Sequence, residues 1–379
     1  MTPGTYFVDD EPALAKRLDV YLAGLAERLA ESPAAAGTLA LVLSGGYGRG
    51  EGGVFRDAEG NPDLYNDLEF YMLLRDPSGE AAARAWCEQE EPAGTAELGI
   101  DVEVKRMPIG ELRRAEPSMF YYDLVVAHQL IWGDESWKEG LPDGLDDAAR
   151  IPLHEATRLL FNRGSGLFYS RCALAKGDDR VGNGFVERNH AKVRLALGDA
   201  VLAANGQYHH FARERNRRVC AGLPDTPPGW DQLVAWHTEG VDFKMHPRHR
   251  ADGETDLDSA QSELAVAWLN TFRWMEQRRL GRSFQSSPDY ANDSGKKYPE
   301  TSGMKNLLIH LRDLKSRGGA LPGWFDYPRA ALQRALVRLV DPAQDPDPQE
   351  IGRLLGISSP PGNWPDLESD YARWWAYYN

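Results

Sequence analysis

The segments LALVL (residues 39–43) and SGGYGRGEGG (residues 44–53) decide the fold of the first part of this chain. Five consecutive apolar residues have the length of a buried strand, and a glycine-rich segment directly after them predicts a tight turn. Backbone amides that glycine leaves accessible can surround an anionic group such as a phosphate. The sequence therefore predicts a strand that ends in a phosphate-binding turn, with Gly45 and Gly46 as the binding residues.

An acidic strand follows this turn in the segment NDLEFYMLL (residues 66–74). Successive side chains of a strand alternate between its two faces, so Asp67 and Glu69 point to one side while Leu68 and Phe70 enter the core. Charge on an apolar strand is costly unless a cation or a partner compensates it. Two carboxylates on one face can hold a divalent cation, and we therefore predict that Asp67 and Glu69 are metal ligands.

A second acidic strand is predicted over residues 99–107, where polar and apolar residues alternate. Asp101 and Glu103 share one face of this strand, and the valines that follow each of them take the other face. Either acid qualifies as a third metal ligand or as the base that deprotonates an acceptor hydroxyl, and Glu103 is slightly preferred. The structural alternative for this face is a solvated strand surface that continues with Lys105.

Helices and strands alternate in the first third of the chain. Apolar residues recur at helical spacing from Pro12 to Glu31, and residues 80–88 form a second predicted helix. Between the glycine turn and the first acidic strand, residues 54–65 predict an inserted loop or hairpin. Strand, strand, helix and strand within about 70 residues indicate a small mixed α/β sheet.

The second part of the chain, after Pro152, is predicted to be helical. Helical periodicity covers the segments 153–175, 185–205, 257–280, 304–315, 329–340 and 367–377. Residues 222–229 and 282–299 are loop-like. The predicted fold class is α+β, with a mixed α/β sheet domain at residues 1–150 and a mostly α-helical domain at residues 151–379.

Composition limits the partners and the location of the protein. The 379 residues carry a formal net charge of −14, which disfavours a broad interface with nucleic acid because such interfaces are basic. No segment has the long apolar run that a membrane span requires, and no secretion signal is visible at the N-terminus. Cys87, Cys172 and Cys220 are far apart, which suits reduced thiols. We therefore expect a cytoplasmic protein without a membrane partner.

These motifs resemble the nucleotidyltransferase superfamily, which includes DNA polymerase β and the aminoglycoside and lincosamide nucleotidyltransferases. The family pattern combines a glycine turn, often continued as Tyr-Ala-Arg-Gly-Glu, with an Asp-apolar-Asp/Glu strand and a third acid on a neighbouring strand. Here these parts read GGYGRGE (residues 45–51), Asp67-Leu68-Glu69, and the strand that carries Asp101 and Glu103. Where the family usually has serine this chain has Gly46, and the resemblance covers the first third of the chain.

The resemblance implies an activity and a cofactor. A nucleoside monophosphate would move from a nucleoside triphosphate, with ATP as the expected nucleotide, to a hydroxyl acceptor, and pyrophosphate would leave. The implied cofactor is Mg²⁺ or Mn²⁺. Asp67, Glu69 and Glu103 would be the catalytic carboxylates that hold it, with Asp101 as the alternative third ligand.

The resemblance also implies cationic residues near the triphosphate. In relatives, a helix of the second domain closes over the nucleotide and often brings a lysine or arginine, and Lys192 is the candidate here. A solvated helix face is the structural alternative for Lys192. Arg49 is expected either to touch phosphate or to form a structural salt bridge with Glu51 or another neighbour.

The acceptor and the class of function stay open at this point. A small molecule or a protein is the expected acceptor rather than bulk nucleic acid, and antibiotic modification and a toxin-like activity on tRNA or protein are both compatible with the sequence. One alternative is a non-catalytic nucleotide-binding or regulatory protein that kept the fold. Another is a helical interaction module in the C-terminal half that acts with a separate partner.

Overall fold

A computed structural model describes residues 5–248, 256–317 and 321–378 of the chain. The fold is mixed α+β, with 60% helix and a small four-stranded sheet. The chain forms two compact units. Unit 1 comprises residues 1–155, 205–224 and 238–249, and unit 2 comprises residues 156–204, 225–237 and 250–379. Because segments beyond residue 150 belong to unit 1, the units are discontinuous in sequence, and the division into contiguous domains at 1–150 and 151–379 stays a prediction.

Unit 1 contains all the strands found in the described part of the chain. Its elements are α1 (Pro12–Ala30), η1 (Pro33–Gly37), β1 (Thr38–Leu43), α2 (Gly45–Gly48), β2 (Val54–Arg56), β3 (Pro62–Leu64), β4 (Asp67–Leu74), η2 (Pro77–Gly79), α3 (Glu80–Leu98), β5 (Asp101–Pro108), α4 (Ile109–Leu112), α5 (Met119–Val126), β6 (Gln129–Gly133), η3 (Glu135–Lys138), η4 (Ala148–Arg150) and α8 (Ala212–Ala221). The helix α9 (Trp230–Met245) adds its C-terminal part, from residue 238 onward.

The sheet of unit 1 has the strand order β5-β4-β1-β6, and β2 and β3 form a separate hairpin. The central strand β1 is antiparallel to β4 and to β6, whereas β4 and β5 are parallel. The register of the parallel pair sets Asp67 opposite Asp101 and Glu69 opposite Glu103. Residues at matching positions of adjacent strands point to the same face, so this register gathers the acidic side chains.

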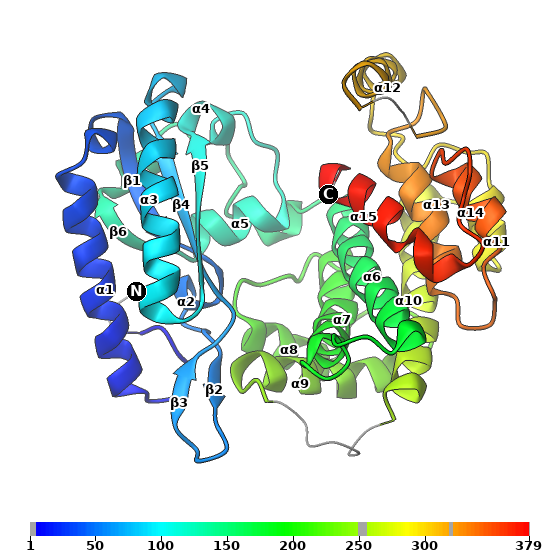
Figure 1. Ribbon diagram of the computed structural model, residues 1–379, viewed down its shortest axis with the longest axis horizontal. Coiled ribbons are helices and arrows are strands. Elements are labelled where there is room, and N and C mark those ends of the chain that lie inside the picture. Colours follow the sequence, from blue (N-terminus) through cyan, green and yellow to red (C-terminus); the bar gives the residue numbers. More distant parts are fainter. Residues whose placement is uncertain (1–4, 249–255, 318–320, 379) are drawn as a thin grey trace. The chain divides into compact units, whose positions relative to one another are not determined.

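Each face of the sheet carries its own apolar core. Figure 1 shows α1 and α3 on one face, where their side chains pack against Leu68 and Phe70, both fully buried. The opposite face, with Tyr71 and Leu73, packs against α5 and the neighbouring loops. Asp67 and Glu69 point to this second face, at the start of β4, and they lie outside its apolar core, which begins at Tyr71.

The regular elements among the described residues of unit 2 are all helices. Its elements are α6 (Leu153–Lys176), which starts in unit 1, α7 (Phe185–Ala204), the N-terminal part of α9, α10 (Leu257–Leu280), α11 (Ser287–Asn292), α12 (Gly303–Arg317), α13 (Arg329–Val340), α14 (Pro348–Leu354), η5 (Trp364–Leu367) and α15 (Glu368–Tyr378). None of the helices in the described ranges combines the length and the apolar composition needed to cross a bilayer.

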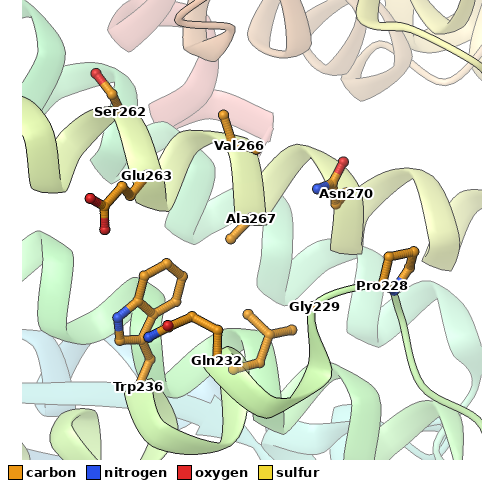
Figure 2. A pocket seen from close by; sticks show the side chains of 10 residues that line it. Pro228, Gly229, Gln232, Trp236, Ser262, Glu263, Val266, Ala267 and Asn270 are labelled. Atoms are coloured by element: carbon orange, nitrogen blue, oxygen red, sulfur yellow. The ribbon is translucent and has the colours of Figure 1, made fainter.

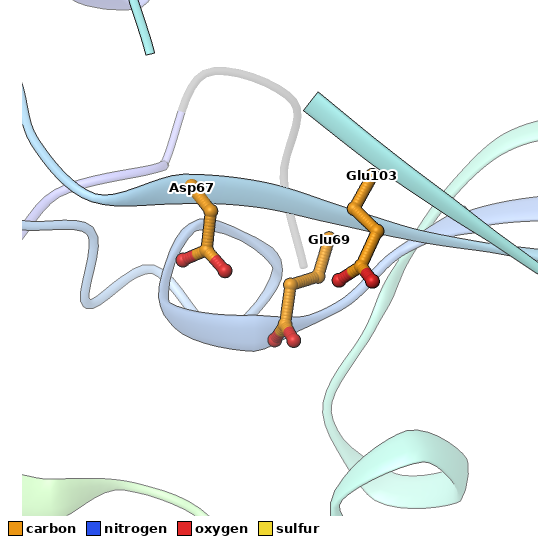
Figure 3. A group of neighbouring side chains, drawn as sticks. All are labelled: Asp67, Glu69 and Glu103. Carbon is orange, nitrogen blue, oxygen red and sulfur yellow. The ribbon is translucent and has the colours of Figure 1, made fainter. Parts of the chain in front are cut away.

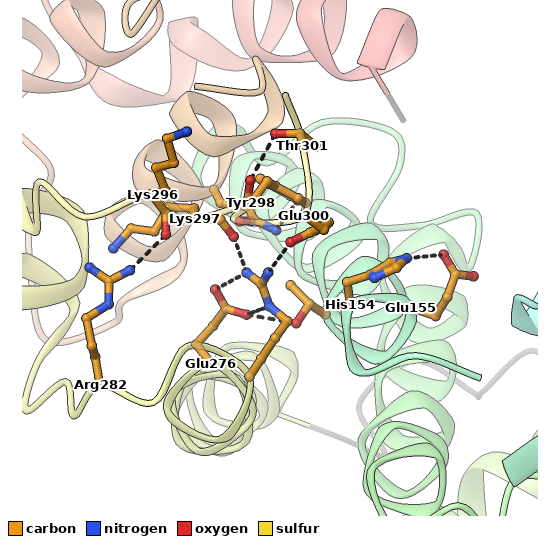
Figure 4. Close-up of polar contacts among 12 residues, drawn as sticks. His154, Glu155, Glu276, Arg282, Lys296, Lys297, Tyr298, Glu300 and Thr301 are labelled. Atoms are coloured by element: carbon orange, nitrogen blue, oxygen red, sulfur yellow. Dashed lines mark hydrogen bonds and ion pairs between the residues drawn. The ribbon is translucent and has the colours of Figure 1, made fainter. Parts of the chain in front are cut away.

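A buried polar network crosses the core of unit 2 (Figure 4). Glu276 of α10 is fully buried. Its Oε1 accepts hydrogen bonds of 2.8 Å from Thr157 and from Nε of Arg279, and its Oε2 accepts bonds of the same length from Arg279 Nη2 and the Tyr290 hydroxyl. Both carboxylate oxygens are thus occupied by donors from three different helices, as a buried charge requires.

Hydrophobic periodicity predicted most of the long elements, and it missed the 16-residue helix α9 and several short elements. The bounds of β4, α10 and α13 are those expected from the sequence, and residues 54–65 form the β2–β3 hairpin. The elements β6, α4, α5, α8, α9, α11 and α14 were not predicted. The prediction was wrong for α11, which lies in a segment taken as loop. It also ended the second helix at residue 88, whereas α3 continues past Pro92 to Leu98. Gly94 lets this additional part of the helix pack closely against Tyr21 of α1.

Candidate metal centre and glycine turn

Three carboxylates meet at the start of β4 and β5 (Figure 3). Asp67, Glu69 and Glu103 each offer one oxygen atom, and these atoms all lie within 4.8 Å of one another. Asp67 and Glu69 are partly buried, and Glu103 is exposed. The parallel register brings Glu103 beside Glu69, so a pairing of strands distant in sequence completes the group.

Asp101 lies outside this group. It pairs with Asp67 in the ladder, and it is exposed at the first position of β5. Of the two acids that the sequence offered for the third position, the structure places Glu103 with Asp67 and Glu69. Oxygen atoms from three carboxylates form the donor set that hard divalent cations such as Mg²⁺, Mn²⁺ and Ca²⁺ prefer, and the geometry does not distinguish among them.

The backbone before Asp67 helps to orient its side chain. Asn66 has a φ of 74°, in the left-handed region that asparagine tolerates better than most residues. Its side-chain amide donates a hydrogen bond to Asp67 Oδ1. The turn from the hairpin into β4 therefore ends on a residue that also fixes the first acid of the group.

Lys105 contacts two of the three acids. Its Nζ lies 3.3 Å from Glu69 Oε1 and 3.0 Å from Glu103 Oε2, and 5.7 Å from the centre of the Tyr71 ring. Burial disfavours the charged lysine, but the hydrogen bond to Glu103 and the nearby negative groups outweigh it and raise the pKa of Lys105. One lysine shared by Glu69 and Glu103 compensates part of their charge and leaves oxygen lone pairs on these two carboxylates for a further cation.

The glycine turn lies directly against the acidic group. The backbone amide of Ser44 donates to the carbonyl oxygen of Glu69 over 2.8 Å. Gly45 has a φ of 64°, and a Cβ atom at this position would lie only 2.7 Å from Glu69 Oε2. A side chain at position 45 would collide with a member of the acidic group, so glycine is required there for both conformation and space.

The first amides of the turn carry no hydrogen bond to the described residues. The amides of Gly48, Arg49 and Glu51 donate to backbone carbonyls, whereas no such bond is found for Gly45 and Gly46 in the described part of the chain. Short helical turns leave their first N–H groups available in this way. The turn can therefore donate to an anion beside the carboxylates, as the sequence predicted for its glycines.

Other glycines of the turn serve packing. A Cβ at Gly48 would lie 2.3 Å from the carbonyl oxygen of Leu43, and one at Gly52 would lie 2.4 Å from the Tyr47 ring. Tyr47 is buried, and its hydroxyl accepts a hydrogen bond of 2.9 Å from the amide of Tyr65. The turn is thus fixed to the segment that leads into β4.

Arg49 forms a structural ion pair. Its Nη1 lies 3.2 Å from Oδ2 of Asp123 on α5, and both side chains are largely buried. The partner is Asp123 and not Glu51. The carboxylate of Glu51 is buried and accepts the amides of Ala212 and Arg213, at the start of α8. A contact between Arg49 and phosphate stays a prediction.

Lys244 is a cation at the turn that the sequence did not reveal. It lies near the C-terminal end of α9, and its Nζ donates to the carbonyl oxygen of Glu51 over 3.0 Å. A Cβ at Gly46 would be 3.4 Å from this Nζ. Burial, followed by the charge of Arg49, lowers the pKa of Lys244 to about 8. No periodicity or motif marks a single lysine in such a segment, and only the fold brings it to the turn.

Lys192 lies in unit 2, on α7, and its side chain is exposed. The carboxylates, the glycine turn and Lys244 all belong to unit 1. The expected contact between Lys192 and a triphosphate therefore stays a prediction.

A separate pocket lies between α9 and α10 in unit 2 (Figure 2). It has a volume of about 450 Å³, and its wall includes Leu233, Trp236 and Val266, with Glu263 as its charged side chain. None of the residues predicted from the sequence lines it. A pocket with an apolar wall and one carboxylate lacks the cations and free amides that a polyphosphate needs.

Comparisons of the chain with protein-family models, with curated proteins and with solved structures gave no match.

Proposed function

We propose that the chain is a divalent-metal-dependent nucleotidyltransferase. The observation that supports this proposal most is the contact between two features of unit 1. Asp67, Glu69 and Glu103 gather their oxygens within 4.8 Å, and Gly45 of the glycine turn lies against Glu69. A cation held by the carboxylates would thus be adjacent to amides that can bind phosphate.

Asp67, Glu69 and Glu103 would hold the metal ion, Mg²⁺ or Mn²⁺. When bound, such an ion neutralises the negative charge that develops on phosphate oxygens during transfer. The same three residues are the catalytic carboxylates of the proposal. Glu103 is the most exposed of them, which suits a carboxylate that also accepts the proton of an acceptor hydroxyl.

Gly45, Gly46 and Lys244 would hold the triphosphate, with ATP as the expected nucleotide. The two glycines offer amide donors, and Lys244 adds a positive charge 3.4 Å from the Cβ position of Gly46. Orientation of the α-phosphorus toward the acceptor oxygen is the main task of such contacts. The new bond joins the acceptor oxygen to this phosphorus, and the bond to the departing pyrophosphate breaks.

The proposal includes the organisation and the setting of the protein. An N-terminal catalytic domain would be followed by a helical domain that closes over the nucleotide. The acceptor would be a small molecule or a protein, since the net charge of −14 disfavours bulk nucleic acid. We also propose a cytoplasmic location, because Cys87, Cys172 and Cys220 are all free thiols.

Substitution of the carboxylates tests this function. Asp67→Asn and Glu69→Gln should each lower pyrophosphate release from ATP and Mg²⁺ by about 1,000-fold, because metal ions contribute several kcal/mol to such transition states. The free energy of unfolding should change by less than about 0.5 kcal/mol, since neither side chain is buried in the core. The measurement combines a coupled pyrophosphate assay, over a panel of hydroxyl acceptors, with urea denaturation.

Asp101→Asn is the matched control, because Asp101 is an acid of the same sheet edge that lies outside the group. It should release pyrophosphate at the rate of the unchanged protein. Equal activity of all three variants would contradict the assignment.

Lys105 supports a second candidate, a non-catalytic nucleotide-binding protein. A lysine that already bridges Glu69 and Glu103 can replace a metal as the charge partner of these acids. Titration of ATP with and without Mg²⁺ separates the two functions. Binding that does not depend on the metal, together with no turnover of any acceptor, would favour the second candidate.

A further inference from the structure

Helix α12 (Gly303–Arg317) turns polar residues toward the body of unit 2. Asn306 and His310, one helical turn apart, are buried. The Asn306 amide donates to the carbonyl oxygen of Phe325 over 3.0 Å, and Nε2 of His310 lies 3.1 Å from the carbonyl oxygen of Asp326. The inner face of the helix is therefore attached through hydrogen bonds to one loop.

Asp313 continues this polar face. It is fully buried, and its Oδ1 accepts a hydrogen bond of 3.2 Å from the Tyr377 hydroxyl, while Oδ2 accepts one from Tyr378. Asn306, His310 and Asp313 follow the spacing i, i+4 and i+7, which is the spacing of a buried helix face. Here that face is polar.

The opposite face of α12 is apolar and exposed. We define the α12 face as Met304, Leu308, Leu311 and Leu314, whose exposed fractions are 65%, 63%, 46% and 45%. Amphipathic helices of globular proteins bury their apolar side, whereas α12 buries its polar side and exposes its apolar side. Phe325, at 58% exposed, lies against Gly303 at the start of the helix and extends the apolar surface. A contiguous exposed apolar surface of this kind marks an interaction site.

The exposed charged side chains described on α12 are all cations. Lys305, Arg312 and Lys315 are exposed, and Asp313, the one acid in the sequence of this helix, is buried. A partner that covers the face must therefore supply apolar side chains flanked by negative charge.

We propose that the α12 face binds an acidic amphipathic helix of a protein partner. Met304, Leu308 and Leu311 recur at the i, i+4, i+7 spacing by which one helix packs along another. Glutamate or aspartate beside the apolar residues of the partner would pair with Lys305 and Lys315. The interface would be independent of the carboxylate group in unit 1, so the proposal does not rest on the proposed function.

Two other occupants fit the charges less well. Pairing of α12 with α12 of a second copy would set cations against cations, which is unfavourable. An anionic membrane surface would attract the lysines, but it would repel a protein whose net charge is −14. An acidic helix would pair with Lys305 and Lys315 without approaching a large negative surface.

The test uses two synthetic helical peptides and the full chain. Both peptides carry leucine at the a and d positions of successive heptads; one has glutamate at e and g, and the other has lysine. Fluorescence anisotropy should show that the glutamate peptide binds at least about tenfold more tightly than the lysine peptide. The binding of the glutamate peptide should weaken as salt is added. Leu308→Glu combined with Leu311→Glu should abolish it.

Lys305→Glu is the second variant, because it reverses one exposed charge and leaves the apolar residues in place. This substitution should weaken binding of the glutamate peptide and strengthen binding of the lysine peptide. Val20→Glu, at an exposed apolar residue of α1, is the control and should bind like the unchanged protein. Circular dichroism confirms that each variant is folded.

Four results would overturn the proposal. The first is equal binding of the two peptides. The second is sedimentation of the unchanged protein, but not of the leucine variant, with phosphatidylserine vesicles, which would identify a membrane surface. The third is a concentration-dependent dimer that the leucine substitutions dissociate, which would identify a second copy. The fourth is a fall in the Tm of the leucine variant in the absence of peptide, which would show that the face is already covered within the chain.

Discussion

Two acidic sites in the described part of the chain, the buried Glu276 and the group of Asp67, Glu69 and Glu103, differ in how far their hydrogen-bonding capacity is used. Glu276 in unit 2 is fully buried, and four donors fill its two oxygens. In the group of Asp67, Glu69 and Glu103 in unit 1, Glu103 is exposed, and Glu69 and Glu103 share the amine of Lys105. Glu276 has all the partners that a buried charge requires, whereas Glu69 and Glu103 share one lysine and keep oxygen lone pairs for a ligand.

This difference separates a structural from a functional use of acidic residues. A saturated buried carboxylate fixes the helices that donate to it, and the cost of losing it appears in the stability of the fold. A cluster with surplus negative charge stabilises the fold little, and its loss should appear in the binding of a cation. Substitutions in the two clusters should therefore affect different measurements.

The largest effect is expected at Glu276. Glu276→Ala should lower the free energy of unfolding by about 3–5 kcal/mol, because it leaves the Arg279 guanidinium buried without its carboxylate. Urea denaturation followed by circular dichroism measures this change.

Glu263→Ala is the control for that measurement, since Glu263 lies on the same helix and is exposed. It should change the stability by less than about 0.5 kcal/mol. A loss below about 1 kcal/mol for Glu276→Ala would contradict the view that the saturated cluster holds unit 2 together.

A smaller effect, on metal affinity, is expected at Lys105. Lys105→Met removes the cation that competes with a metal for Glu69 and Glu103, and keeps a side chain of similar length. The affinity for Mn²⁺ should rise by about tenfold, which corresponds to about 1.4 kcal/mol. Isothermal titration calorimetry with Mn²⁺ in the absence of nucleotide measures it.

Lys138→Met controls for the loss of one positive charge, because Lys138 is a partly exposed lysine of unit 1 that pairs with Glu135 instead. It should leave the Mn²⁺ affinity unchanged. If Lys105→Met also leaves the affinity unchanged, or lowers it, the carboxylates are not the metal site, and Lys105 is their permanent partner.

The sequence predicted the parts of the candidate site that depend on local pattern. Alternation in residues 66–74 predicted the common face of Asp67 and Glu69, because a strand has a fixed period of two. Alternation could not decide whether Asp101 or Glu103 is the third acid of the group, because both point to the same face of β5. The choice depends on the register between β4 and β5, which is set by pairing across more than thirty residues and cannot be derived from either strand alone.

Contacts between distant segments could not be predicted at all. The partner of Arg49 is Asp123, which lies 74 residues away on a helix that the periodicity missed. Lys244 reaches the glycine turn because its segment belongs to unit 1, although the segments 156–204 and 225–237 that precede it belong to unit 2. The family resemblance indicated Lys192 on a predicted helix instead, since a tertiary contact such as that of Lys244 cannot be read from the sequence.

The smallest effect is expected from the ionisation of Lys244, and it concerns binding of the triphosphate at the turn. Only the protonated amine attracts phosphate, and the pKa of Lys244 is lowered to about 8 by burial and by Arg49. The affinity for ATP is measured without metal, so that metal binding by the carboxylates does not contribute to it. It should fall as the pH rises, and at pH 8 it should be about twofold weaker than at the acidic plateau. Lys244→Met should remove the fall in ATP affinity near pH 8 and leave the rest of the pH dependence unchanged.

The same group gives a readout that needs no ligand. Its pKa lies near 8 in the folded protein and near the ordinary value of 10.5 in the unfolded chain, so the unfolded chain binds more protons between these two values. The free energy of unfolding of the unchanged protein, relative to Lys244→Met, should therefore rise as the pH increases from about 8 toward 10.5 and stay flat below about pH 7. A difference that is flat over the whole range would show that Lys244 is not buried at the turn. A rise in stability without the step in ATP affinity would show that the lysine is buried there but does not contact phosphate.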